Sequence, residues 1–187
     1  MMKSIIRKTT YEAIYRLLDK VSPIKEDCGK LCNAACCSCG ADEDPNDFQL
    51  GIYLLPGEEK IFNQTDEWIT WNKEPAQNYD FPKSWTGNVY FIRCKTPPIC
   101  PRDRRPLQCR FFPLSPHLTE NGVLQLIIFP GELPYSCPLI KDKMTLNADF
   151  IQANYTVWKR LIKDPLIYDL VKMDSDDRSW MDLIVIK

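Results

Sequence analysis

Apolar and polar positions alternate along this chain in a way that predicts helices near both ends. Over residues 9–21, apolar side chains recur at spacings of three and four, the period of a helix with one buried stripe. The stripe consists of Tyr11, Ile14, Tyr15, Leu18 and Val21. Pro23 ends this pattern, because proline cannot continue a helix. A second helical pattern follows Asn147, a good N-cap residue, and Asp164-Pro165 breaks it before another short helix, so residues 147–173 are expected to be helical.

The middle of the chain predicts a few short strands separated by irregular segments. Residues 48–55 and 88–93 are rich in aromatic and β-branched side chains, and residues 123–129 follow Asn121-Gly122, a typical hairpin turn. Pro56-Gly57 indicates the start of a short helix, and residues 183–186 predict a last strand. Residues 62–86 and 95–118, the latter with six prolines, are expected to lack regular structure, and Cys137-Pro138 to lie in a loop.

Composition places the chain among ordinary globular proteins. A length of 187 residues suits one domain, and 44% hydrophobic and 26% charged residues are typical shares. The net charge of −1 argues against nucleic-acid or membrane partners. The first twenty residues carry charges throughout and lack the apolar run of a signal peptide, so the chain is expected to be cytoplasmic. Thiols stay reduced there, and clustered cysteines bind metal more often than they form disulfides.

The cysteines carry the main functional signal. Five of the nine lie within residues 28–39, and such a density of soft ligands predicts a metal, an iron–sulfur cluster or disulfides. Positions four apart share one face of a helix, so several of these thiolates could converge. Together with the later Cys94, Cys100, Cys109 and Cys137, the early Cys28, Cys32, Cys36 and Cys37 provide enough thiolates for two four-coordinate zinc sites or for one iron–sulfur cluster with spares. Cys39 and the single histidine, His117, are left unassigned.

A basic segment accompanies the later cysteines. Residues 93–110 contain six arginine and lysine residues against Asp103 alone. Cations beside cysteines lower the thiol pKa and stabilise the deprotonated, metal-bound form. At least one arginine of this segment is therefore predicted to lie against the metal or cluster, and Arg105 and Arg110 are the candidates. A solvated basic loop or an anion-binding patch is the alternative.

The combined pattern resembles the CxxCxxCC family of zinc- or iron-chelating proteins. The matching residues are Cys28, Cys32, Cys36 and Cys37, then Cys94, Cys100, Arg105-Pro106, Cys109-Arg110 and Phe112-Pro113, with Cys137 as a later lone cysteine. The first two spacings are three residues rather than two, and Cys39 has no counterpart. The resemblance covers residues 28–140 and implies metal chelation with an unsettled biological role. Such a domain also resembles part of flagellin lysine methylases, which leaves open an iron–sulfur redox or methyl-transfer-associated enzyme.

Two further interpretations are weaker. Cys32, Cys36 and Cys39 match the C-x3-C-x2-C signature of radical enzymes that use S-adenosylmethionine, but the chain is short for their barrel and no strand leads into the motif. A disulfide-stapled secreted protein fits poorly with an odd cysteine count and no signal peptide. The sequence thus predicts one α+β domain over residues 1–187, with helices and short antiparallel strands around an irregular, metal-clamped centre. Whether it is an enzyme is left open, with the balance against.

Overall fold

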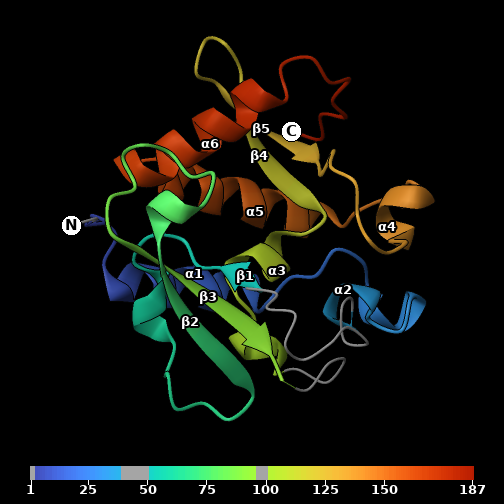
Figure 1. Ribbon diagram of the computed structural model, residues 1–187. Coiled ribbons are helices and arrows are strands. Elements are labelled where there is room, and N and C mark those ends of the chain that lie inside the picture. Colours follow the sequence, from blue (N-terminus) through green and yellow to red (C-terminus); the bar gives the residue numbers. More distant parts are fainter. Residues whose placement is uncertain (1–2, 39–50, 96–100) are drawn as a thin grey trace.

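The computed structural model describes residues 3–38, 51–95 and 101–187, and within these it has helices and two small antiparallel sheets (Figure 1). This confirms the predicted α+β class. The helices are α1 (Lys8–Leu18), α2 (Ala35–Ser38), α3 (Leu107–Phe111), α4 (Pro138–Lys141), α5 (Ala148–Leu161) and α6 (Pro165–Asp177). Single 3-10 turns are η1 (Cys28–Leu31), η2 (Glu58–Ile61), η3 (Ala76–Asn78) and η4 (Arg102–Arg104). The strands are β1 (Ile52–Tyr53), β2 (Ile69–Pro75), β3 (Asn88–Cys94), β4 (Leu114–Leu118) and β5 (Leu124–Ile128).

The terminal helices form where the apolar period predicted them. Helix α1 buries Tyr11, Ile14, Tyr15 and Leu18, four of the five residues of its predicted stripe. Helix α5 begins directly after Asn147, although the Asn147 side chain does not cap it. The side-chain Nδ2 of Asn147 instead donates a hydrogen bond of 3.0 Å to the backbone carbonyl of Ser22. This bond holds the start of α5 to the segment after α1. Helix α6 extends to Asp177, four residues beyond the predicted end.

The first sheet corrects one expectation. Its strand order is β1-β3-β2, and all neighbours are antiparallel, with Trp71 opposite Ile92. Strand β2 lies inside residues 62–86, for which no regular structure was predicted. That prediction was wrong because the polar run Asn72-Lys73-Glu74 on this edge strand hides the period of two. Strand β3 confirms the prediction at 88–93, whereas β1 covers two residues of the predicted strand 48–55, of which 48–50 lie outside the described ranges.

The second sheet is a hairpin of β4 and β5, and it corrects a second expectation. Gly122 in its turn has φ of 73°, a conformation that glycine adopts without strain, as the Asn121-Gly122 signal predicted. Strand β4 and helix α3 lie within the proline-rich residues 95–118, where no regular element was expected. Proline is tolerated at edge positions, and Pro116 lies in β4, at the end of the strand order β4-β5.

The chain after β5 contains a short turn and a short pairing. Cys137-Pro138 was expected in a loop, but Pro138 begins the one-turn helix α4, with Cys137 at its N-cap. Near the end of the chain Val185 forms an isolated antiparallel bridge with Ile127, which is as much strand as residues 183–186 show. Among the described residues, none of the helices has the length and apolar character needed to cross a bilayer.

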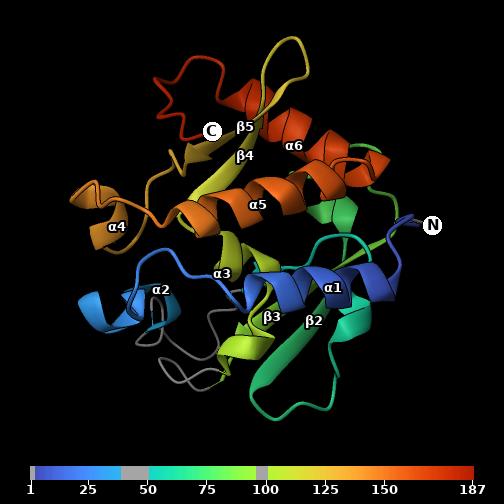
Figure 2. The same ribbon diagram turned by 180° about the vertical axis from the view of Figure 1, so that it is seen from behind.

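Helix α5 lies at the centre of the main core. It contacts α1 on one side and the β4–β5 hairpin on the other, while α6 packs on β4. Figure 2 shows the same order from behind, with α6 above α5 and α1 below it. Helices α2 and α4 both lie at the end of the molecule away from the N-terminus (Figure 1). A smaller apolar cluster of Leu54, Ile69 and Ile92 lies on the first sheet.

Candidate thiol centre

The cysteine-rich segment is two short helical turns joined by a strained reversal. Turn η1 ends at Leu31 and α2 begins at Ala35. Between them Asn33 and Ala34 have φ of 51° and 53°, the left-handed region in which residues other than glycine are strained. The Ala34 amide donates 2.8 Å to the Gly29 carbonyl, which closes the loop. This reversal folds the cysteines of η1 back toward those of α2.

Cys36 lies against the neighbouring cysteine. Its sulfur lies 4.0 Å from the sulfur of Cys37. The hydrogen bond between these two thiols lowers the Cys36 pKa, while burial and the nearby cysteines Cys109, Cys28 and Cys32 raise it. Cys109 lies in α3, more than seventy positions along the chain, and it is still near enough to raise the Cys36 pKa. Five of the eight predicted ligands therefore contribute to one electrostatic environment.

The remaining predicted ligands lie at the ends of other elements. Cys94 is the last residue of β3 and is half-buried, and Cys137 is 9% exposed at the start of α4. Their role as ligands stays a prediction. Cys100 and the unassigned Cys39 lie outside the described residues. Within residues 3–38, 51–95 and 101–187, no three or more His, Cys, Asp or Glu side chains are arranged so that they could hold a metal ion.

Arg110 is fixed by groups other than the thiols. Its side chain is only 5% exposed, and one guanidinium nitrogen lies 2.5 Å from the Asp19 carboxylate at the end of α1. The other nitrogens donate to the carbonyls of Arg105 (2.7 Å) and Asp103 (2.6 Å). The guanidinium also stacks over the Tyr15 ring, 4.3 Å from its centre. Arg110 thus ties α1 to the segment that carries Cys109, and its predicted contact with a metal or cluster stays untested.

A buried glutamate beside this segment was missed by sequence reasoning. Glu58 is 0% exposed, although Glu58-Glu59 has the composition of an exposed helix start. Gly57, at φ 93°, turns the chain so that Glu58 enters the core. Its carboxyl accepts hydrogen bonds from the Tyr15 hydroxyl (2.6 Å) and the amides of Leu55 and Leu107 (both 2.9 Å). Burial raises the Glu58 pKa despite these bonds and the positive charge of Arg110.

His117 lies on the hairpin, at the α6 side of the core. Its Nδ1 atom is buried and has no hydrogen-bond partner among the described residues. Burial lowers the His117 pKa, and the charge of Arg178 lowers it further. Both effects keep the imidazole neutral. The structure gives this histidine a place in the packing of β4, and its relation to the thiols stays untested.

Fold and site together define a small α+β protein in which thiols from two distant segments approach one another. Comparison with known proteins adds no relative to this description. No family model, no curated protein and no solved structure matches the chain. The resemblance to the CxxCxxCC family therefore stays an expectation from the cysteine pattern.

Proposed function

We propose that this protein binds zinc or an iron–sulfur cluster through its clustered cysteine thiolates. The observation that carries the proposal is the position of Cys36, which lies against Cys37 and within electrostatic reach of Cys109. Thiolates repel one another, and a shared cation is the usual reason for gathering them. Cys28 and Cys32 belong to the same group, and the sequence adds Cys94, Cys100 and Cys137 to the proposed ligand set.

The sulfur–sulfur distance between Cys36 and Cys37 fits two thiolates that share one metal ion. Four thiolates placed tetrahedrally at about 2.3 Å from zinc lie about 3.8 Å from one another. The Cys36 and Cys37 sulfurs are 4.0 Å apart, so both could bind one zinc ion with little change. In a [2Fe–2S] cluster two thiolates likewise share one iron, so this distance also fits such a cluster, whereas each iron of a [4Fe–4S] cluster takes one thiolate. Because no described group is already arranged to hold a metal, binding must draw the other thiols closer.

Backbone strain in the cysteine-rich segment also supports a bound metal. Ala34 is left-handed at a cost of about 1–2 kcal/mol, and Asn33 adopts the same region at a smaller cost, because asparagine tolerates it. Such strain persists where another interaction over-determines the structure, and it is common at ligand sites. A structural zinc ion contributes about 10–16 kcal/mol in small domains, which easily exceeds the cost of both residues. Zinc would hold the strained loop in place, and a cluster would in addition allow electron transfer.

Metal analysis of protein purified without oxygen tests this proposal. The wild type should contain zinc in simple stoichiometry and be colourless, or contain iron and sulfide and be brown. Cys109→Ser and Cys36→Ser should each lose most of the metal, while Cys39→Ser, outside the proposed set, should keep it. Circular dichroism shows whether each variant is folded. A metal-free wild type, or a Cys109→Ser protein with full metal content and unchanged Tm, would contradict the proposal.

A further inference from the structure

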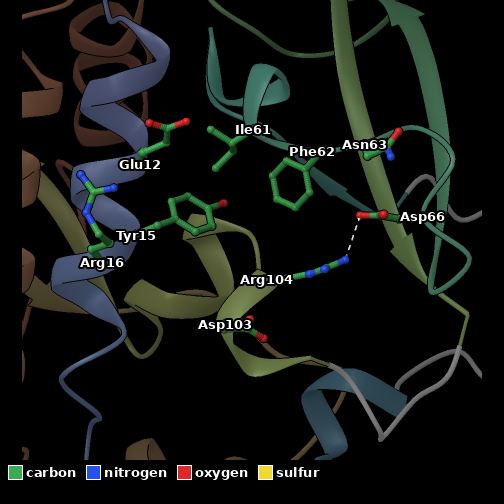
Figure 3. Close-up of a pocket in the computed structure, with 9 residues that line it drawn as sticks. All are labelled: Glu12, Tyr15, Arg16, Ile61, Phe62, Asn63, Asp66, Asp103 and Arg104. Carbon is green, nitrogen blue, oxygen red and sulfur yellow. Dashed lines mark hydrogen bonds and ion pairs between the residues drawn. The ribbon is translucent and has the colours of Figure 1, made fainter.

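A cleft lies alongside helix α1, where Tyr15 lines it. It has a volume of about 500 Å³, and its walls come from α1, the segment at and after η2, and η4. Figure 3 shows the side chains that surround it. This size is typical of small-molecule sites, which range over roughly 300–1,000 Å³.

Buried polar groups fix the walls of the cleft. The Tyr15 hydroxyl donates to the fully buried carboxyl of Glu58, which also accepts from the Leu107 amide. On the opposite wall, the Asp103 carbonyl accepts from Arg110, and the same guanidinium stacks on Tyr15. The α1 wall and the η4 wall are therefore joined through the Arg110 side chain, which is 5% exposed. A cleft braced in this way loses little entropy when a ligand binds.

Charges of both signs line the cleft. Glu12 projects from α1 toward the open space, and Arg104 projects from η4 on another side of it (Figure 3). One Arg104 nitrogen lies 3.5 Å from the Asp66 carboxylate, a long contact for an ion pair. Arg104 is 55% exposed and Asp66 20%. A guanidinium has five N–H donors, so a ligand anion can be bound alongside this contact.

Apolar side chains separate the two charged groups. The rings of Tyr15 and Phe62 meet edge to face with centres 6.2 Å apart, and Ile61 lies next to Phe62. Phe62 and Ile61 are half-buried, so part of each faces the cleft. A ligand that spans the charged groups would cross this apolar wall, and methylene groups are the chemistry that suits it.

We infer that the cleft binds a small zwitterion, with an ammonium group at Glu12, a carboxylate at Arg104 and a short aliphatic chain between them over Phe62. Both charged contacts are needed, because a rim charge alone contributes little affinity in water. The inference does not depend on the proposed metal, since none of the cysteines that the structure describes lines this cleft.

A homologous series of ω-amino acids tests the inference. Glycine, β-alanine, γ-aminobutyrate, δ-aminovalerate and ε-aminohexanoate keep both charges and differ only in the distance between them. Titration of the wild-type protein, followed by calorimetry or NMR, should show an affinity that rises to an optimum along the series. Butylamine and butanoate, each with one charge, should bind at least about tenfold more weakly than the best zwitterion. Metal content, measured in the same samples, separates this result from the fate of the thiol proposal.

Charge-removing variants locate the site. Glu12→Gln and Arg104→Gln should each weaken binding of the best zwitterion at least about tenfold. Glu120→Gln and Arg160→Gln, at exposed positions outside the cleft, are matched controls and should bind as the wild type does. Unchanged binding in both cleft variants would overturn the inference. So would equal binding of butylamine and the zwitterions, or no binding of any member of the series at millimolar concentration.

Discussion

The buried carboxyl of Glu58 gives the sharpest test of the structure. Glu58→Ala removes the acceptor for three donors: the Tyr15 hydroxyl and the amides of Leu55 and Leu107. The hydroxyl can rotate toward water in the neighbouring cleft, whereas the two amides are held by the backbone. A buried donor without a partner costs about 1–3 kcal/mol, so two amides cost about 2–6 kcal/mol. We therefore expect Glu58→Ala to lower the free energy of unfolding by about 4 kcal/mol.

Urea unfolding followed by circular dichroism measures this loss. Since about 1 kcal/mol corresponds to about 2–4 °C in Tm at this size, the melting point should fall by about 10 °C. Glu59→Ala, one position along the chain, is the matched control and should change stability by less than about 0.5 kcal/mol. The stability loss of Glu58→Gln should lie between those of Glu58→Ala and Glu59→Ala. A glutamine keeps one acceptor oxygen, but its NH₂ group takes the place of the other oxygen and faces a backbone N–H that needs an acceptor. A Glu58→Ala protein whose free energy of unfolding lies within about 1 kcal/mol of the wild-type value would refute this set of hydrogen bonds to Glu58.

The pKa of Glu58 adds a pH dependence with a definite sign. Burial raises this pKa above its ordinary value of 4.5, so in the window between the two values the folded state binds more protons than the unfolded state. Stability from this group is complete below pH 4.5 and is lost as pH rises through the raised pKa. Glu58→Gln does not titrate, so the stability advantage of the wild type over Glu58→Gln should shrink as pH rises. An advantage that grows over that window would refute the assigned direction.

Three other predictions concern the thiol segment and its support. Arg110→Lys should lower the free energy of unfolding by about 2 kcal/mol in urea unfolding, because an ammonium cannot bond to Asp19 and two carbonyls at once. An unchanged midpoint would argue against these contacts of Arg110. Ala34→Gly should raise Tm slightly, since glycine removes about 1 kcal/mol of strain at this left-handed position. A lowered Tm would contradict the left-handed conformation of Ala34. A zinc or iron chelator should speed amide exchange in residues 28–37 far more than in α5, and equal or unchanged rates would count against a clamp there.

Periodicity predicted the elements whose burial is one-sided. Helices α1 and α5 each bury one stripe against the core, and the period of their apolar residues survives in the sequence. Strand β2 was missed because Asn72, Lys73 and Glu74 are polar on both faces of an edge strand. Its register is set by β3 rather than by its own pattern. Pairing across the chain is information that a local window of sequence does not contain.

Among the polar residues of the site, those close together in sequence were predicted and those that meet only in the fold were not. The cysteines of residues 28–37 were visible as a group because they are close in sequence. The approach of Cys109 rested on a family resemblance, since spacing alone does not say which distant residue arrives beside them. Glu58 gave no signal, because its partners Tyr15 and Leu107 lie more than forty positions away on either side. A carboxylate that bonds across the fold looks the same in sequence as one that faces solvent.

The two halves of the thiol group differ in how they are held, and this difference explains what a metal would do. Cys109 lies in α3, where Leu107 and Phe111 are buried in the main core and Arg110 is tied to α1. The cysteine loop at residues 28–37 instead contains Asn33 and Ala34, which have left-handed backbones. No residue of η1 is buried, and neither is its N-cap residue Asp27. The core therefore holds Cys109 in place, while the cysteine loop has no residue of η1 buried in that core. A metal shared between them would fasten the loop to a scaffold that is already folded.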